Sequence, residues 1–221
     1  MAAVLTTEPE SRSRRRVCMA LSALAKFAAV EVDLSRLRGG YSLHQVNPRE
    51  LPDDTTISAW YKRIPNKSWA WFYGMLATYG LRPDEAFHLV SIESTGVIEV
   101  GADTKTGSRL VWPLFPEWVS EWSLLDATPP AITGKNNSAL GDRSSQFFRR
   151  LGLPFKLYDL RHCWARRSLE FGLDISLCSQ QMGHSLAVHS KVYQAWIDRK
   201  THQKAMEALV QKADRPFAPK T

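Results

Sequence analysis

Five short stretches of the chain carry side chains that together could act on a phosphate ester. They are Gly80-Leu81-Arg82-Pro83-Asp84-Glu85, the turn lysine Lys105, Leu157-Tyr158-Asp159-Leu160-Arg161-His162, Met182-Gly183-His184 and Val192-Tyr193. A tyrosine hydroxyl can attack phosphorus and hold it as a covalent ester. Arginines can fork onto the non-bridging oxygens, and a lysine can give a proton to the departing oxygen. These residue types therefore suit cleavage of a phosphodiester without a metal ion.

Each of these residues, taken alone, also has a purely structural interpretation. Tyr193 suits packing on a helix, and Arg82 can pair with Glu85 three residues later. Arg161 can be one more solvated charge, and Lys105 in an exposed turn can simply face solvent. The order and spacing of the five stretches must therefore decide between the two interpretations.

In order and spacing, the five stretches resemble the motifs of the tyrosine recombinase, or phage-integrase, family. That family shows G-L-R-x-x-E, a lysine on a β-hairpin, H-x-L-R-H, L-G-H and a tyrosine nine residues later. This chain reads GLRPDE, TKTG, YDLRH, MGH and Y, with nine residues from His184 to Tyr193 and 23 from Arg161 to His184. Each motif is weak alone, but five in order over residues 80–193 form a specific signal.

The resemblance implies a catalytic role for five residues. Tyr193 would be the nucleophile, Arg82 and Arg161 would clamp the phosphate, and Lys105 would be the general acid. His184 would hydrogen-bond the phosphate and help with the proton of the nucleophile. The resemblance implies no cofactor and no metal ion.

For the residues next to these five, the expected role is either supporting or undecided. The resemblance implies that Glu85 supports the fold around the first arginine, and we interpret His162 as a buried support. Tyr158 stands where the family usually has His or Lys, and its hydroxyl can donate to a phosphate but carries no charge at neutral pH. It is either part of the catalytic set or structural. Arg109 competes with the turn lysine, and we expect His189 at the surface.

The composition describes a folded, basic chain that suits a polyanionic partner. Its 221 residues include 44% hydrophobic residues, eight tryptophans and a net charge of +7. Residues 143–172 hold seven basic and two acidic residues, a surplus of five, and residues 197–221 add six against three. A solvated helix face and a nucleic-acid footprint both fit such a window. Because this window surrounds Arg161, we interpret it as facing phosphate.

Several functional classes are excluded by what the sequence lacks. No apolar run approaches the ~18 residues of a membrane span, and no phosphate-binding glycine loop occurs. The three cysteines, Cys18, Cys163 and Cys178, are far apart, which argues against disulfides or a zinc site and for a reducing compartment. We expect a cytoplasmic, nucleoid-associated protein of a phage or bacterium.

The hydrophobic periodicity and the turn residues predict a mainly α fold with a small antiparallel β-sheet, of the α+β class. The predicted helices cover residues 17–30, 54–63, 66–80, 116–125, 143–151, 157–171, 174–182, 186–196 and 201–213. Residues 96–101 and 109–113 alternate as short strands around a turn, and residues 128–141 read as a loop. The resemblance implies the architecture of a tyrosine recombinase catalytic domain.

We expect three segments along the chain. Residues 1–16 read as a flexible basic leader. Residues 17–52 read as a helix plus linker, a possible remnant of an N-terminal core-binding domain, because Gly and Pro interrupt residues 36–52. Residues 53–221 form the expected catalytic domain, whose C-terminal helix packs either on its own domain or on a neighbouring protomer.

The expected function is site-specific recombination of double-stranded DNA attachment sites, for integration or excision of a mobile element. Strands would be cut and rejoined through a covalent 3′-phosphotyrosine by a homo-tetramer on DNA that is a monomer when free, with no membrane partner. Two alternatives stay open: a degenerate remnant that binds DNA without cutting it, and an activity like that of a type IB topoisomerase.

Overall fold

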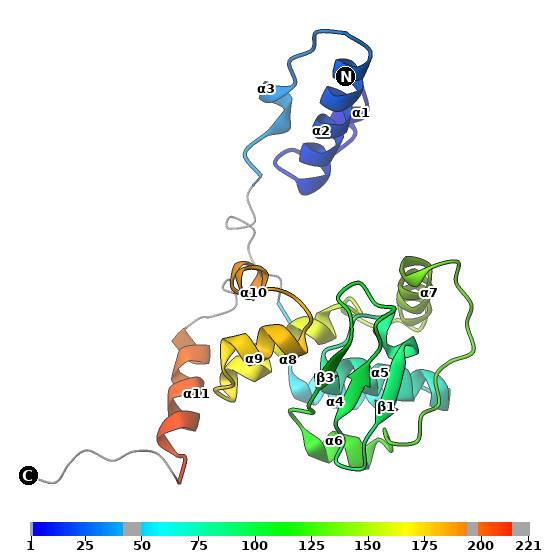
Figure 1. Cartoon of the computed structure of the whole chain (residues 1–221), viewed down its shortest axis with the longest axis vertical. Helices are drawn as coiled ribbons and strands as arrows, with labels where there is room; N and C mark the ends of the chain where they lie inside the picture. The colour runs from blue at the N-terminus through cyan, green and yellow to red at the C-terminus, as the bar shows by residue number, and fades with distance from the viewer. Residues whose placement is uncertain (1, 42–49, 194–198, 214–221) are drawn as a thin grey trace, which may run out of the picture. The chain divides into compact units, whose positions relative to one another are not determined.

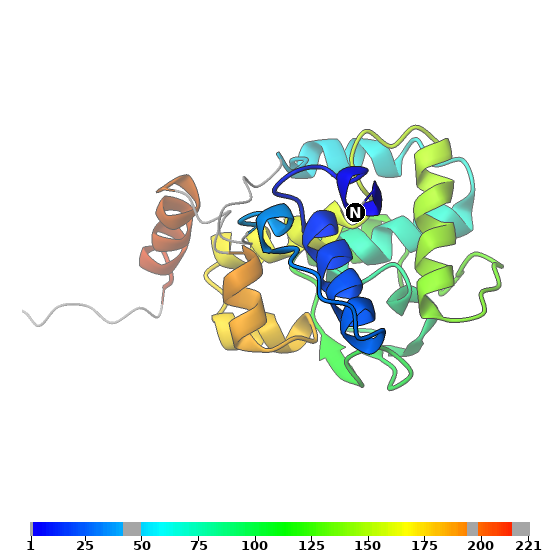
Figure 2. The same cartoon turned by 90° about the horizontal axis from the view of Figure 1, so that it is seen from above.

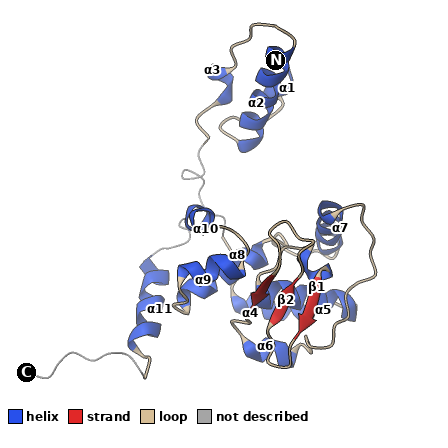
Figure 3. Cartoon of the chain, in the orientation of Figure 1, coloured by secondary structure: helices blue, strands red, loops and turns tan. Residues whose placement is uncertain are grey.

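A computed structural model of the chain describes residues 2–41, 50–193 and 199–213, with backbone alone at 191–193 and 199–201. The chain divides into two compact units, Met1–Asn47 and Pro48–Thr221. Among the described residues, helices predominate and strands form one small sheet (Figure 3). The predicted α+β class, mainly α with a small antiparallel sheet, is confirmed.

The first unit is a small helical cluster. It comprises α1 (Ala2–Leu5), α2 (Arg12–Phe27) and α3 (Ser35–Arg38). Its buried contacts join Val4, Cys18 and Leu34, so one residue from α1, one from α2 and one preceding α3 make its core.

The prediction of a flexible leader over residues 1–16 is wrong for residues 2–5 and 12–16, which are helical. Helix α2 begins earlier than predicted because the side chain of Ser11 accepts a hydrogen bond from the backbone N–H of Arg14 at 3.1 Å. The arginines that follow are good helix formers. A run of arginines therefore extended the helix instead of leaving the chain without structure.

The second unit holds the five stretches with chemical potential. Its elements are α4 (Asp54–Tyr61), α5 (Lys67–Tyr79), the short 3₁₀ helix η2 (Glu85–Phe87), β1 (Leu89–Ile92), β2 (Ile98–Val100), β3 (Arg109–Val111), α6 (Pro116–Glu121), α7 (Asn137–Arg150), α8 (Asp159–Glu170), α9 (Ile175–Gln181), α10 (Leu186–Tyr193) and α11 (Arg199–Val210). Helices α7 and α11 lie at opposite ends of this unit (Figures 1 and 2).

The sheet is antiparallel in the order β1-β2-β3. Strands β2 and β3 fall inside the predicted ranges, and Ile98 pairs with Val111. Strand β1 was not predicted, because Leu89–Ile92 is a four-residue run without alternating burial. It pairs with β2 through an irregular register between Leu89 and Ser91.

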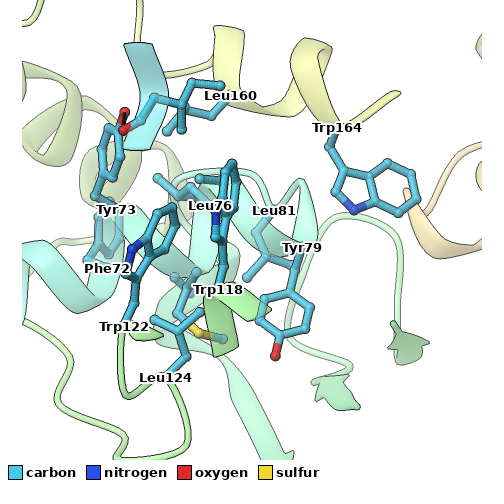
Figure 4. Packing of buried hydrophobic residues seen from close by; sticks show 14 of the residues in the cluster. Phe72, Tyr73, Leu76, Tyr79, Leu81, Trp118, Trp122, Leu124, Leu160 and Trp164 are labelled. Atoms are coloured by element: carbon cyan, nitrogen blue, oxygen red, sulfur yellow. Dashed lines mark hydrogen bonds between the residues drawn. The ribbon is translucent and has the colours of Figure 1, made fainter. Parts of the chain in front are cut away.

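Helix α5 is buried along almost its whole length and forms the centre of the core. Asn66 caps its start by accepting from the backbone N–H of Trp69 at 3.1 Å. Gly80 ends it in the left-handed region with φ of 64°, so the helix lies within the predicted range 66–80. Helix α5 packs against α8, and side chains of α5, α6 and α8 meet in the core (Figure 4).

The buried helix α8 is fixed to its surroundings by an arginine. The Nη2 atom of Arg167 lies 2.6 Å from Oδ1 of Asp54, and its guanidinium lies over the rings of Phe115 and Trp118 at 4.6 and 4.8 Å. Arg167 and Arg161 are each 1% exposed. The interpretation of the whole window 143–172 as facing phosphate is therefore wrong for Arg167, which pairs with Asp54 and holds a buried part of the fold.

Four of the five remaining basic residues of the window face solvent, and the fifth, Arg166, is half-buried. Arg143, Arg149, Arg150 and Lys156 are exposed, and three of them lie on α7. That helix starts at Asn137, six residues earlier than predicted, because the side chain of Asn136 accepts from the backbone N–H of Ala139. The basic surface of the second unit thus comes from α7 and the loop that follows it.

The C-terminal helix α11 packs on α8 of its own chain. The ammonium group of Lys204 lies 3.1 Å from a carboxylate oxygen of Glu170, and the Leu209 side chain covers Gly172, where an added Cβ would lie 3.5 Å from it. Two apolar residues of α11, Met206 and Val210, are 56% and 55% exposed.

Candidate active site

The site is organised around one buried carboxylate, that of Glu85, which is 0% exposed. After Gly80 the chain leaves α5, and the short helix η2 places the carboxylate of Glu85 against Arg82. Oε2 of Glu85 accepts from the backbone N–H of Arg82 at 2.8 Å, and Oε1 accepts from its Nη1 at 2.6 Å. The supporting role expected for Glu85 fits this geometry.

Three guanidinium groups share this carboxylate. Besides Arg82, Nη2 of Arg109 lies 2.7 Å from Oε2 of Glu85, and Nη1 of Arg161 lies 3.8 Å from the same atom. Burial raises the pKa of Glu85, but the three arginines lower it more, so that the pKa lies below its ordinary value. Counted over these four side chains, the cluster carries two more positive than negative charges, which suits an anionic ligand.

The same three arginines also bind the end of helix α9. Arg109 donates from Nε to the carbonyl of Gln181 at 2.7 Å, Arg161 donates to the carbonyl of Met182, and Arg82 donates to the carbonyl of Gly183 at 3.2 Å. These carbonyls lie at the negative end of the helix, where the last turn lacks intrahelical partners. Each arginine thus stabilises one of three consecutive carbonyls.

The three guanidinium groups differ in how far they reach the surface. The side chain of Arg82 is 16% exposed, that of Arg109 is 8% and that of Arg161 is 1%. Arg161 also donates from Nη1 to the carbonyl of Gly80 at 2.7 Å, which links the end of α5 to the end of α9. Arg82 is therefore the arginine of this cluster most accessible to a ligand.

His184 follows directly after the arginine-bound carbonyls, and its ring contacts His189 of α10. Nε2 of His184 and Nδ1 of His189 are 2.9 Å apart. His189 is only 1% exposed, so its expected place at the surface is wrong. Burial, then the charge of Arg161, then His189 lower the pKa of His184 to about 3. The ring of His184 is therefore uncharged at neutral pH.

The turn that carries Lys105 reaches the site through the next residue. Oγ1 of Thr106 accepts from Nη1 of Arg82 at 3.2 Å, whereas Lys105 is exposed. Arg109, the competitor of Lys105, is instead bound to Glu85 and to the carbonyl of Gln181. Among the described residues of this turn, only the neighbour of Lys105 contacts the cluster, so the role of Lys105 as general acid stays a prediction.

Tyr158 and His162 lie together at the start of α8. Their rings meet edge to face with centroids 5.2 Å apart, and Tyr158 is 39% exposed while His162 is 9% exposed. His162 is thus buried as expected. Tyr193 is the last residue of α10, and its side chain lies outside the described residues. Helix α10 itself packs against α9 and α8.

Within the described residues, no group of His, Cys, Asp and Glu is arranged to hold a metal ion. None of the helices in the same part of the chain is long and apolar enough to cross a membrane. The three cysteines are buried thiols.

A family profile and several known proteins match parts of this chain. Residues 1–38 match the profile of the XisA/XisC excisase second domain. Excisase A of Nostoc sp. (strain PCC 7120) is 33% identical over 220 residues, covering 83% of this chain and 46% of the relative. Excisase C of the same organism is 35% identical over 162 residues, covering 66% of this chain and 32% of the relative. The chain therefore spans less than half the length of these relatives.

A solved structure shares the fold. The crystal structure of XerA recombinase matches with a TM-score of 0.51 at 18% identity, over 90% of this chain and 76% of that chain. This chain belongs to the tyrosine recombinase family. The resemblance inferred from the five motifs is thus confirmed, and the tyrosine recombinase brings Arg82, Glu85, Arg161 and His184 together from segments up to 102 residues apart.

Two residues of the site in this tyrosine recombinase make contacts that the sequence did not predict, since Arg109 was considered only as a competitor of Lys105 and His189 was expected at the surface. Arg109 binds both Glu85 and the end of α9, and His189 binds His184. The only sequence signal for Arg109 is a charge at the start of a predicted strand. His189 gives none, because its contact depends on how α10 folds back on α9.

Gly183 lies close against Thr106 and Arg109 in the tyrosine recombinase site, and replacing it by alanine is expected to destabilise the protein. Its φ is +59°, and an added Cβ would lie 2.5 Å from Oγ1 of Thr106 and 3.1 Å from Arg109. We expect a loss of about 2–3 kcal/mol in the free energy of unfolding, measured by urea denaturation. Gly152→Ala is the matched control, since its φ is +85° and its Cβ would meet nothing within 4 Å. Equal losses in the two variants would contradict the close approach.

Proposed function

We propose that this tyrosine recombinase cuts and rejoins double-stranded DNA at specific sites, as in the excision of a DNA element. One observation carries the proposal. Arg82 and Arg161 both contact Glu85, and their charges act on His184 next to them. This excess of positive charge lies at the end of α9, against which the helix ending at Tyr193 packs. The names of the relatives, excisases and a recombinase, point to the same activity.

In the proposed reaction, one phosphate ester is exchanged for another. Oη of Tyr193 attacks the phosphorus, an Oη–P bond forms, and the bond from phosphorus to the 5′ oxygen breaks. The products are a 3′-phosphotyrosine and a 5′-hydroxyl, whose proton comes from Lys105. Because the ester is conserved, a second 5′-hydroxyl can reverse the step on another strand without ATP.

The arginine cluster would stabilise the charge that develops on the phosphate. Arg82, as the most exposed of the three, would bind a non-bridging oxygen first. Arg161 would bind the phosphate by exchanging a bond to the carbonyl of Gly80 or Met182 for one to a phosphate oxygen. Guanidinium groups already held by Glu85 need little reorganisation, which is the condition for efficient electrostatic stabilisation. The uncharged His184 would accept the proton that the hydroxyl of Tyr193 loses, and would hydrogen-bond the phosphate.

The domain arrangement belongs to the same proposal. Residues 1–38 would be the end of a core-binding domain, as their match to the excisase second domain suggests. Residues 53–221 would form the catalytic domain, with exposed basic residues of α7 toward the DNA. A homo-tetramer would exchange strands in pairs.

The experiment that tests the proposal is covalent trapping on nicked duplexes. Overlapping duplexes that cover the DNA flanking the gene, each nicked so that a short strand is lost after cleavage, are incubated with the protein and run on a denaturing gel. We expect a protein–DNA band on a few neighbouring duplexes, unchanged by EDTA, and no band on duplexes of shuffled sequence. No band on any duplex would contradict strand cleavage. Relaxation of any supercoiled plasmid, without preference for a site, would instead indicate a topoisomerase.

A further inference from the structure

The contact between His184 and His189 ties two functional parts of the second unit together. His184 lies in the turn after α9, next to the carbonyls that the arginines bind. His189 is on α10, and Tyr193 is the last residue of that helix, about one turn further on. The 2.9 Å contact between the two rings therefore joins the phosphate end of the site to the helix that carries the proposed nucleophile.

The hydrogen bond between the two rings holds only one proton. Nε2 of His184 and Nδ1 of His189 face each other, so one nitrogen must donate and the other accept. A second proton in the bond would leave two N–H donors facing each other at 2.9 Å without an acceptor, and a further proton on either ring would make that ring a cation. That cation would lie close to Arg161 of α8, Arg82 before η2 and Arg109 of β3, against one carboxylate, Glu85. Burial and the charge of Arg161 lower the pKa of both rings, and Arg82 and Arg109 lower that of His184 further.

We propose that His189 is a positioning residue that holds the ring of His184, in one orientation and one tautomer, against the phosphate site. This role rests on the proposed function. His189 does not touch the reacting atoms but acts through His184. Because His189 lies on α10, the same contact also fixes the turn after α9 relative to the helix that carries Tyr193. Its burial fits this role, since a ring that is 1% exposed has little freedom to leave the bond.

Three variants of His189 separate the hydrogen bond from simple packing. Asparagine places an amide where Nδ1 lies and can restore the bond, glutamine places it one atom further, and leucine fills the space without a polar atom. We expect His189→Leu to lower the rate of covalent trapping by about 10- to 100-fold, since misplacing a catalytic group by about 1 Å can cost about 100-fold. His189→Asn should recover most of this loss and His189→Gln should not. Binding of the same duplex, measured by fluorescence anisotropy, should change less than twofold in all three.

A spectroscopic measurement on the DNA-free protein makes the test independent of activity. Long-range ¹H–¹⁵N correlation spectra of the imidazole rings should show one tautomer of His184 in the wild type and in His189→Asn, and a mixture in His189→Leu. Unchanged His184 signals in His189→Leu, or wild-type trapping by that variant, would overturn the positioning role alone. A wild type that traps no duplex would overturn the proposed function, and the role with it. Circular dichroism melting curves identify any variant that fails to fold, in which case His189→Asn and His189→Gln decide.

Discussion

Replacing Glu85 by alanine is expected to lower the free energy of unfolding by about 3–5 kcal/mol, because it leaves Arg82, Arg109 and Arg161 without their shared carboxylate. All three guanidinium groups are at least largely buried, with side-chain exposures of 16%, 8% and 1%. Removing one partner of a buried ion pair costs far more than the pair contributes, because the remaining charge has lost its solvent as well. Urea denaturation at neutral pH measures the effect.

The control for this variant is Glu121→Ala, which removes an exposed carboxylate at the end of α6. Its effect should stay within about 0.5 kcal/mol. If Glu85→Ala were as stable as Glu121→Ala, Glu85 would not be the counter-ion of the cluster.

The pH dependence of Glu85→Gln tests the same carboxylate through its charge. The pKa of Glu85 is lower in the folded protein than in the unfolded chain. The stabilisation it provides is therefore fully present above the unfolded value of about 4.3 and is lost as the pH falls through the folded pKa. Glu85→Gln should lack this component, so that its stability falls less steeply below about pH 4.3 than that of the wild type. Parallel curves would contradict the lowered pKa.

Replacing Arg161 by lysine is expected to lower the rate of covalent trapping by about 100- to 1000-fold. The charge is kept, but a single ammonium group cannot reach the carbonyls of Gly80 and Met182 and remain near Glu85 at once. The end of α9 would lose one of its three arginine contacts, and a phosphate would lose a two-pronged donor. Trapping rates on the best duplex and urea denaturation, measured together, separate lost chemistry from lost stability.

Arg149→Lys is the matched control for Arg161→Lys. Arg149 is an exposed residue of α7 in the same basic window, so its replacement should change DNA affinity slightly and leave the trapping rate of bound DNA unchanged. If Arg161→Lys trapped DNA at the wild-type rate, Arg161 would not be part of the phosphate clamp.

The parts of the fold that could be predicted from sequence are those with local causes. Asn66 and Gly80 delimit α5 through hydrogen bonds and backbone geometry within a few residues, so their types alone identified both ends. The motif spacing likewise predicted that Arg82, Glu85, Arg161 and His184 belong to one site. The start of α7 at Asn137 was missed because Asn and Ser suit a loop as well as a helix cap.

The parts that could not be predicted depend on contacts between distant segments. Charge in a sequence does not show whether a side chain is buried, so Arg167 looked like surface charge although it pairs with Asp54, 113 residues away. The burial of His189 and the binding of Arg109 to the end of α9 require the packed arrangement of α9, α10 and β3. His189 was therefore missed as a member of the site, and Arg109 was considered only as a competitor of Lys105.

The most direct test of the account is to locate the covalent bond in the trapped complex. Trypsin digestion followed by mass spectrometry should find the nucleotide on the peptide 192–199, which contains Tyr193 and follows Lys191. The exposed Tyr158, which lies in the peptide 157–161 beside the same cluster, is the alternative carrier. A phosphodiester on Tyr193 is the predicted result. A nucleotide on Tyr158, or on any residue other than Tyr193, would contradict the proposed mechanism.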